Sequence, residues 1–267
     1  GGVTLKSGQI LFLPTVLQPE KLSPALQNIF REVDGDIDVT ARFNWHDGVL
    51  SSDGEAVIAA RKLVTNEYTV TDAATTITFD SLVPLSTPPE QVVDISVLDF
   101  GVPITDGRVI LELKKDGSVR AGLEKFNLFG GRIETRPFTL PQDFNNFTIP
   151  LAVTGVQLDE LLSIAKFGDL TATGALDGLL PLTIADGEVA VLGGLLETTN
   201  PGIIQYQPKG VGDALSDVNE GAALFLDIVK NFKYERIQVS LDETEFEQIA
   251  LGFGIEGHNE AVYGGYR

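Results

Sequence analysis

The sequence predicts a mainly β protein: one large curved antiparallel sheet that forms a groove, with about three short helices packed on it. Short segments of alternating apolar and polar residues recur almost to the end of the chain, and glycine-rich turns separate them. A β-strand turns successive side chains to opposite faces, so each such segment is apolar on one side and polar on the other. Three isolated helical segments are too few for a regular alternation of strands and helices.

The alternation is clearest in residues 36–45. Asp47-Gly48 follows as a hairpin signal, and the return strand is expected over 54–63. The apolar parity of the first strand comprises Ile37, Val39, Ala41, Phe43 and Trp45.

Similar patterns predict strands through most of the remaining chain. The internal ones are expected at 67–72, 75–80, 91–98, 107–114, 118–124, 131–135, 169–175, 180–184, 187–192 and 203–206. Two long strands close the chain, one with Ile237, Val239 and Leu241 on its apolar parity and the other with Ile249, Leu251, Phe253 and Ile255. We expect these seven residues to form one continuous face, because a register slip of one residue would turn them all to water.

Helical spacing appears in three places. Ser23-Pro24 can cap and open a helix that reaches Val33. A second helix is expected over 157–166, with Gly168 as its stop. The third, over 213–231, has one apolar stripe and is expected to pack on the closing strands. Its stripe comprises Val218, Ala222, Phe225, Val229 and Phe232.

Length and composition predict a folded protein. The 267 residues allow a single β-rich domain over 1–267, with an alternative boundary in the Pro-rich stretch 84–90. The net charge of −19 disfavours nucleic-acid binding, because such a surface repels a phosphate backbone. The absence of Met and the leading Gly1-Gly2 indicate a fragment of a longer chain. No apolar run approaches the ~18 residues of a membrane helix.

No motif predicts a catalytic residue, a metal site or a cofactor. Gly252-Phe253-Gly254-Ile255-Glu256-Gly257 matches the dinucleotide-binding spelling, but no helical pattern follows, so a strand with a small face is the better interpretation. There is no Cys, and the two histidines lack convergent partners. We interpret His46 as a turn residue. Among 38 acidic residues nothing singles out a hydrolytic carboxylate pair, although such a pair stays an alternative.

Several turn motifs resemble a known family. The order Gly178-Leu-Leu-Pro181, Asp186-Gly187, Gly193-Gly194 and Asn200-Pro-Gly-Ile-Ile-Gln-Tyr206 is similar to a segment of the YdbH family of bacterial envelope proteins, which also carries the label "dicarboxylate transport". Leu226-Asp-Ile-Val229, Asn231-Phe-Lys-Tyr234, Gly257-His-Asn259 and Gly130-Gly131 add to the resemblance. It covers about residues 90–260, and it departs at Asn259-Glu260, where the family usually has Asn-Pro.

The resemblance implies a relative of the AsmA-like proteins, with a β-taco-like groove. Such proteins are anchored in the inner membrane of Gram-negative bacteria and extend through the periplasm, where phospholipid acyl chains slide along an apolar inner face. The family also implies strand addition to a small outer-membrane lipoprotein at the C-terminal end. It implies no enzymatic activity and no cofactor.

The expected functional site is therefore an apolar strand face that binds acyl chains. Its candidate residues are Ile37, Val39, Phe43, Val109, Leu111, Leu113, Ile237, Val239, Leu241, Ile249, Leu251, Phe253 and Ile255. A sheet with one continuous apolar face that three short helices cover only in part leaves an exposed strip, which usually marks a binding surface. The main alternative is a structural or adhesion module with a closed core and no ligand.

Overall fold

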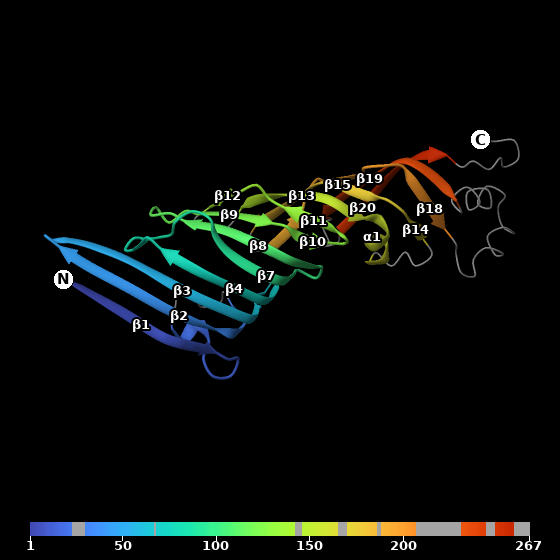
Figure 1. Cartoon of the computed structure of the whole chain (residues 1–267). Coiled ribbons are helices and arrows are strands. Elements are labelled where there is room, and N and C mark those ends of the chain that lie inside the picture. The colour runs from blue at the N-terminus through green and yellow to red at the C-terminus, as the bar shows by residue number, and fades with distance from the viewer. Residues whose placement is uncertain are drawn as a thin grey trace, which may run out of the picture. The chain divides into compact units, whose positions relative to one another are not determined.

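The computed structural model describes residues 1–22, 30–66, 68–141, 146–164, 170–185, 188–206, 231–243 and 249–258. Eighteen strands form one antiparallel sheet, and two more form a small hairpin (Figure 1). In the described chain, β1 (Gly2–Phe12) pairs only with β2 (Glu32–His46), and β20 (Ile249–His258) pairs only with β19 (Phe232–Glu243). The sheet is therefore open and not closed into a barrel.

The chain divides into two compact units. Unit 1 comprises Gly1–Leu128, Ile133–Ile149 and Thr183–Val189, and unit 2 comprises Phe129–Arg132, Pro150–Leu182 and Ala190–Arg267. The stretch 84–90 lies inside unit 1.

Unit 1 is a meander of long antiparallel strands. From β1 and β2 it continues through β3 (Val49–Val64), β4 (Thr69–Phe79), β7 (Gln91–Asp99), β8 (Pro103–Leu113), β9 (Val119–Glu124) and β12 (Phe138–Leu140), with β10 (Phe126–Leu128) also paired to β8. The hairpin predicted at Asp47-Gly48 is confirmed. Both residues have positive φ, 50° and 77°, as the favoured two-residue turn requires.

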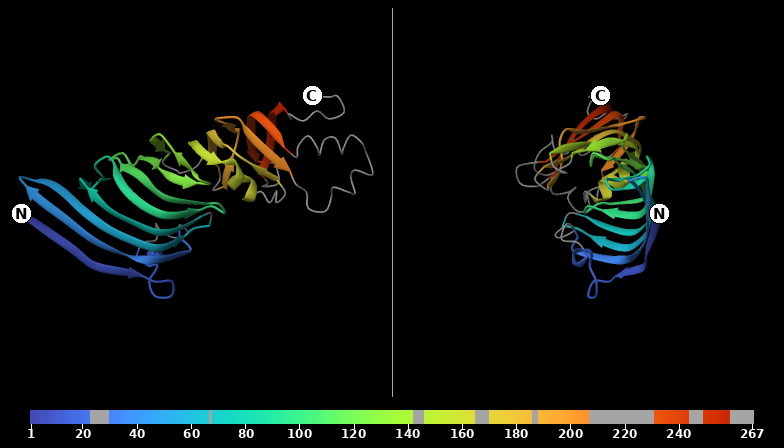
Figure 2. Two further views of the ribbon diagram at one scale, coloured as in Figure 1. Left: turned by 45° about the vertical axis from the view of Figure 1, so that its right-hand side comes forward. Right: turned by 90° about the vertical axis from the view of Figure 1, so that its left-hand side faces the viewer.

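A line of irregular pairing, which we call the bulge line, crosses four of these strands. Arg61 is an extra residue opposite Asp34 and Gly35 of β2. In the next three ladders the facing pairs Arg61 and Asp72, Asp72 and Ser96, and Ser96 and Asp106 are left unpaired without a shift of register. Asp72 and Asp106 have φ of 49° and 53°. Bulges bend a strand and strengthen its twist, and the long strands drawn in blue bend along their length (Figure 2).

On one side of the bulge line, the apolar residues of five strands form a buried row. Val33 pairs with Leu63, which pairs with Val70, and the row continues through Leu98 to Ile104. Four of the five side chains are buried, and Leu63 is half-buried. This row is one part of the core of unit 1, which also includes the buried residues Ala56, Ile77 and Ile95.

Phe126 closes the same end of the core over β8. Its side chain is fully buried, and its ring lies on Gly107, where an added Cβ would overlap the ring. Only glycine therefore allows the ring to approach the strand this closely.

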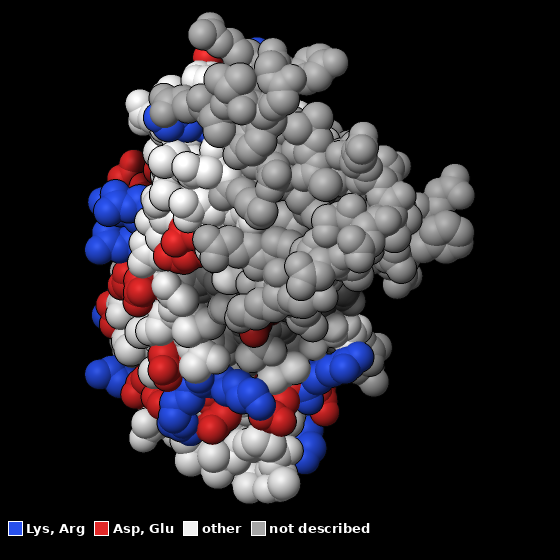
Figure 3. All heavy atoms as spheres, turned by 90° about the vertical axis from the view of Figure 1, so that its right-hand side faces the viewer, with Lys and Arg blue, Asp and Glu red and all other residues white. Residues whose placement is uncertain are grey.

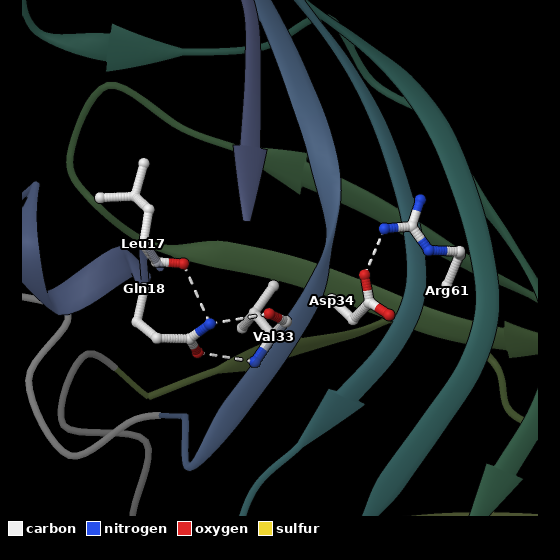
Figure 4. Close-up of polar contacts among 5 residues, drawn as sticks. All are labelled: Leu17, Gln18, Val33, Asp34 and Arg61. Atoms are coloured by element: carbon white, nitrogen blue, oxygen red, sulfur yellow. Dashed lines mark hydrogen bonds and ion pairs between the residues drawn. The ribbon is translucent and has the colours of Figure 1, made fainter. Parts of the chain in front are cut away.

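Gln18 completes the pairing of β2 beyond the end of β1. Its Nε2 donates to the Val33 carbonyl (2.8 Å) and to the Leu17 carbonyl (3.0 Å), and its Oε1 accepts from the Val33 N–H (2.8 Å; Figure 4). The side-chain amide thus replaces the backbone of a neighbouring strand. Gln18 is buried without an unsatisfied polar group.

The second small sheet is a hairpin between β4 and β7, formed by β5 (Ser81–Leu82) and β6 (Leu85–Ser86). The Leu82 N–H donates to Ser52 Oγ (3.1 Å), and the Leu82 side chain lies over Gly54, 3.1 Å from the position of an added Cβ. Thr87 bonds Leu113 in both directions, each bond 2.9 Å long. The hairpin is thereby fixed to β3 at one end and to β8 at the other.

Unit 2 has its own strand order. Successive strands pair in the order β11 (Gly131–Glu134), β13 (Phe147–Gln157), β15 (Ala175–Ala185), β17 (Gly194–Thr198), β19 and β20. On the edge of β19 that pairs with β17, β18 (Gly202–Tyr206) also pairs with β19, and β14 (Leu170–Ala172) pairs with β18. Strand β16 (Glu188–Val191) belongs to the same sheet.

Tyr234 joins three segments of unit 2. Its side chain is buried, and its hydroxyl donates to the Thr173 carbonyl. The ring lies against Gly202, whose added Cβ would be 2.7 Å from Tyr234 Cζ, and the hydroxyl lies close to Gly174. Desolvation of the buried hydroxyl raises its pKa.

The prediction of three helices needs correction. The described chain contains one α-helix, α1 (Leu158–Ile164), where a helix was expected over 157–166, and a 3-10 turn at Pro19–Lys21. Val33 lies in β2, so the first predicted helix does not reach it; most of its remaining length, residues 23–29, lies outside the described residues. The helix predicted over 213–231 also lies outside them, except for residue 231.

Most of the expected strands are confirmed, with two kinds of correction. Residues 67–72 and 75–80 were expected as separate strands, but they belong to β4, a single strand that runs from Thr69 to Phe79. Strands β1, β5, β6, β10, β12, β13 and β17 were not predicted. Gly252–Gly257 lies within β20, which confirms the strand interpretation of this glycine-rich motif.

Candidate functional site

The strand register gathers the apolar residues of unit 1 on one face. Starting from Ile37, directly paired residues in successive strands are Ile58, Thr75, Val93, Val109 and Leu123. We call this side of β1–β4 and β7–β9 the apolar face. The six candidates of this unit, Ile37, Val39, Phe43, Val109, Leu111 and Leu113, all occupy its parity.

Exposure changes along the strands of the apolar face. All six candidate residues are half-buried. Toward the β2–β3 turn, the ends of β1–β3 are exposed, with 49% of Trp45, 58% of Leu50 and 55% of Leu5 accessible, whereas the paired residues Ala56 and Ile77 on the same face are buried. Toward the bulge line it ends in the buried row from Val33 to Ile104. The described part of unit 1 therefore presents an accessible apolar surface on one side of its core.

The opposite face of unit 1 is charged. Ion pairs join neighbouring strands at Arg42–Asp53 (2.7 Å), Lys62–Glu32 (3.1 Å) and Arg108–Asp94 (3.1 Å). Arg61 in the bulge line pairs with Asp34, and this carboxylate raises the pKa of the guanidinium (Figure 4). Seen from the right-hand side of Figure 1, the surface of the described residues also carries interspersed acidic and basic side chains (Figure 3). Exposed pairs like these contribute little stability, but they keep this face in water.

Two hollows lie on the charged side of unit 1. The larger, about 570 Å³, follows the bulge line and is lined by Arg61, Asp72, Asp106 and Arg108 among others. The smaller, about 380 Å³, lies over β7–β9 and includes Val92, Ile110 and Arg120. A charged lining does not suit an acyl chain, because an unpaired charge must stay solvated.

The candidates of unit 2 fall into different environments. Ile237 pairs with Ile255 and Val239 with Phe253, so these four residues share one face, as predicted. Val239 is fully buried and Ile237 is 2% exposed, whereas 42% of Phe253 and 47% of Ile255 are accessible. Leu241 is half-buried and pairs with Leu251, and Ile249 pairs with Glu243. For Leu251 and Ile249 only the backbone is described.

The described residues contain no group of three or more His, Asp or Glu side chains that could hold a metal ion. His46 is the last residue of β2, directly before the Asp47-Gly48 turn, and its Nε2 is 3.1 Å from Asp47 Oδ2. Gly252 and Gly254 face Ser240 and Gln238 on the next strand.

Sequence reasoning missed part of the apolar face. Val3 pairs with Phe43 and Leu5 with Ala41, so β1 extends the face by one strand. Leu123 and Ala121 of β9 extend it at the other side. The alternation of Val3 and Leu5 was a usable signal, but the bulge between Lys6 and Gln9 breaks it after two residues.

An open sheet with one accessible apolar face and one charged face is typical of a protein that binds an apolar ligand on its surface. The model of the YdbH-like family, described as intermembrane phospholipid transport protein YdbH, matches residues 1–267. The chain therefore belongs to the YdbH-like family of intermembrane phospholipid transport proteins. No curated protein and no solved structure shows significant similarity to it.

Family membership settles the broad function. The ligands are phospholipids, the place of action is the cell envelope, and lipid transport is in general a non-catalytic activity. Within the described residues, no helix is long and apolar enough to cross a membrane.

Proposed function

We propose that the apolar face of unit 1 is the surface that carries phospholipid acyl chains. The observation that supports this best is the uninterrupted row of half-buried side chains from Ile37 through Val93 to Val109 and Leu123, which lies opposite a face of cross-strand ion pairs. Each buried methylene of a lipid contributes about 0.8 kcal/mol. Partial burial of one chain along several strands is thus sufficient for binding without covalent chemistry.

In this proposal the acyl chain lies in a groove formed by the curved sheet, as in a β-taco, and moves along it without a catalytic step. The protein works in the periplasm of a Gram-negative bacterium, with the full-length protein anchored in the inner membrane. Ile37, Val39, Phe43, Val109, Leu111 and Leu113 contact the lipid directly. The charged opposite face keeps the carrier in water.

The candidates of unit 2 have two roles in the same proposal. The exposed side chains of Phe253 and Ile255 continue the lipid-contacting surface, together with Leu241, Ile249 and Leu251. Ile237 and Val239 are core residues, because acyl chains cannot reach side chains that are 2% and 0% exposed. Their burial is what the alternative of a closed structural module expects, and it favours that role for the centre of β19.

Strand addition to a small outer-membrane lipoprotein is the proposed protein contact. Strand β20 supports it, since in the described chain β20 pairs only with β19. A partner strand could bond to its other edge. Gly252 and Gly254 add no bulk to one side of this strand.

Leu111 and Ile110 offer a matched test of the lipid-carrying face. They are neighbours in β8, both are half-buried, and they point to opposite faces of the sheet. A photoreactive amino acid at Leu111 should capture phospholipid in cells, whereas the same probe at Ile110 should capture little. Mass spectrometry of the crosslinked lipid identifies the ligand. Equal capture at the two positions, or none at Leu111, would refute the proposal.

A charge at the same two positions gives an independent measurement. Leu111→Asp should reduce the amount of phospholipid that copurifies with the protein, because the carboxylate must be solvated where an acyl chain would lie. Ile110→Asp introduces the same charge into the same strand on the charged face and should leave copurified lipid near the wild-type amount. Far-UV circular dichroism confirms that both variants are folded.

A further inference from the structure

The apolar face of unit 1 ends in two different rims. At the bulge-line end, Gln18 bonds to Val33, and Phe126 covers Gly107, so the last apolar residues are buried. At the other end, the β5–β6 hairpin packs over Ser52 and Gly54 of β3, but Trp45 and Leu50 beside the β2–β3 turn remain exposed. We call this end the open rim; its exposed apolar residues are Trp45, Val49, Leu50, Val83 and Leu85.

The β5–β6 hairpin belongs to the open rim because of how it is attached. Ser52 is 8% exposed and accepts the Leu82 N–H, while Gly54 leaves room for the Leu82 side chain. Both positions are on the apolar parity of β3, since Ser52 pairs with Phe43 and Gly54 with Ala41. The attachment therefore lies on the apolar face itself.

The hairpin tip remains exposed despite this attachment. Val83 is 69% accessible, as is Val49, the first residue of β3, and Leu85 is 45% accessible. The hairpin tip and the strand ends beside the β2–β3 turn thus both carry exposed apolar residues at this rim. Trp45 and Leu50, which pair directly, lie on the apolar parity at the end of β2 and β3. Exposed apolar residues grouped at one place mark an interaction site more often than residues scattered singly.

We propose that the open rim is the lateral entrance through which a phospholipid acyl chain passes onto the apolar face, with its headgroup left outside. This inference rests on the proposed function of that face. Continuity supports it: Trp45 and Leu50 extend the rows of Phe43 and Ser52 without a change of parity. A Trp ring, which has an apolar body and a polar N–H, is suited to the boundary between acyl chains and water.

The charges at the rim fit a phospholipid better than a neutral apolar ligand. The β8–β9 turn, which lies at the same strand ends, carries the adjacent exposed cations Lys114 and Lys115 beside the apolar residues Leu113 and Val119. In a chain of net charge −19, two neighbouring cations can attract the phosphate of a headgroup. The acyl chain and the phosphate would then meet apolar and cationic groups at one rim.

An entrance affects the rate of loading, whereas the lipid-carrying face affects the amount of lipid bound, so the two proposals can be tested separately. The 267-residue chain is mixed with vesicles of phosphatidylethanolamine and phosphatidylcholine that contain a trace of phospholipid with a fluorescent acyl chain. Val83→Asp/Leu85→Asp should slow the uptake of the labelled lipid at least several-fold, with the amount bound at equilibrium little changed. Leu111→Asp should lower the amount bound.

Residues at the opposite rim provide the control. Phe100 and Val102, in and beside the β7–β8 turn, are 44% and 38% exposed, so they are accessible apolar residues next to the buried end of the face. Phe100→Asp/Val102→Asp should leave the uptake rate unchanged. Equal slowing by both double variants, or no slowing by Val83→Asp/Leu85→Asp, overturns the entrance at the open rim. If, in addition, Leu111→Asp binds as much lipid as the wild type, the lipid-carrying face is refuted as well.

Discussion

The contact between Phe126 and Gly107 predicts a measurable coupling between two substitutions in unit 1. Phe126→Ala removes a fully buried aromatic ring and should reduce the free energy of unfolding by about 3–5 kcal/mol. Gly107→Ala places a methyl group inside the volume of the ring, which must shift, and this overpacking should cost about 1–3 kcal/mol. In the double variant the methyl group occupies part of the vacated space. Its cost should therefore fall below the sum of the two single costs by at least about 1 kcal/mol.

The assay is urea denaturation followed by tryptophan fluorescence. Trp45 is the only tryptophan in the chain and lies in unit 1, so the signal reports the unfolding of the unit that carries both substitutions. Gly122→Ala in the adjacent strand β9 is the control, since an added Cβ there would be 3.4 Å from Pro137 Cα, an ordinary contact distance. Additive costs in the double variant, or a cost for Gly107→Ala no larger than for Gly122→Ala, would show that the ring does not lie on Gly107.

Two further predictions concern single polar side chains. Gln18→Ala should destabilise unit 1 by about 1–3 kcal/mol in the same assay, because it leaves the N–H and carbonyl of Val33 without their partner. A loss below about 0.5 kcal/mol would contradict the role of Gln18 as a substitute for a neighbouring strand. In unit 2, burial raises the pKa of the Tyr234 hydroxyl above the value of about 10 in an unfolded chain. The contribution of the neutral hydroxyl to stability is therefore present below about pH 10 and is lost as the pH rises further. The denaturation midpoint of the wild type should therefore fall more between pH 8 and pH 10.5 than that of Tyr234→Phe, and equal falls would contradict this reasoning.

The general architecture could be predicted from the sequence because alternation is a direct consequence of strand geometry. The polar and apolar parities of residues 36–45 correspond to the two faces of β2, and Asp47-Gly48 is the turn that its sequence indicates. The closing strands pair as their parities require, with Ile237 opposite Ile255. In each case the signal is local and lies within a few residues.

What the sequence could not reveal depends on contacts between distant segments. The spacing of Ala60 to Leu63, and of Val70 to Ala73, is three and not two, because Arg61 and Asp72 are left out of the pairing between β3 and β4. A pattern of strict alternation therefore divides β4 into two strands. Nothing near Gln18 in the sequence indicates that its amide meets Val33. The burial of Val239 and the exposure of Phe253 could not be distinguished either, since both have the same parity in long apolar strands.

Glycines on the apolar parity explain where the apolar face of unit 1 is covered and where it is open. Gly54 accommodates Leu82 of the β5–β6 hairpin, and Gly107 accommodates the Phe126 ring, so each glycine marks a place where another segment packs on the face. Between them, the row from Ile37 to Val109 contains β-branched residues and no glycine. A large side chain at these positions would be incompatible with a segment that packs as closely as Leu82 or Phe126. The ligand that we propose for this row, a flexible acyl chain, can follow the side chains without such a close approach.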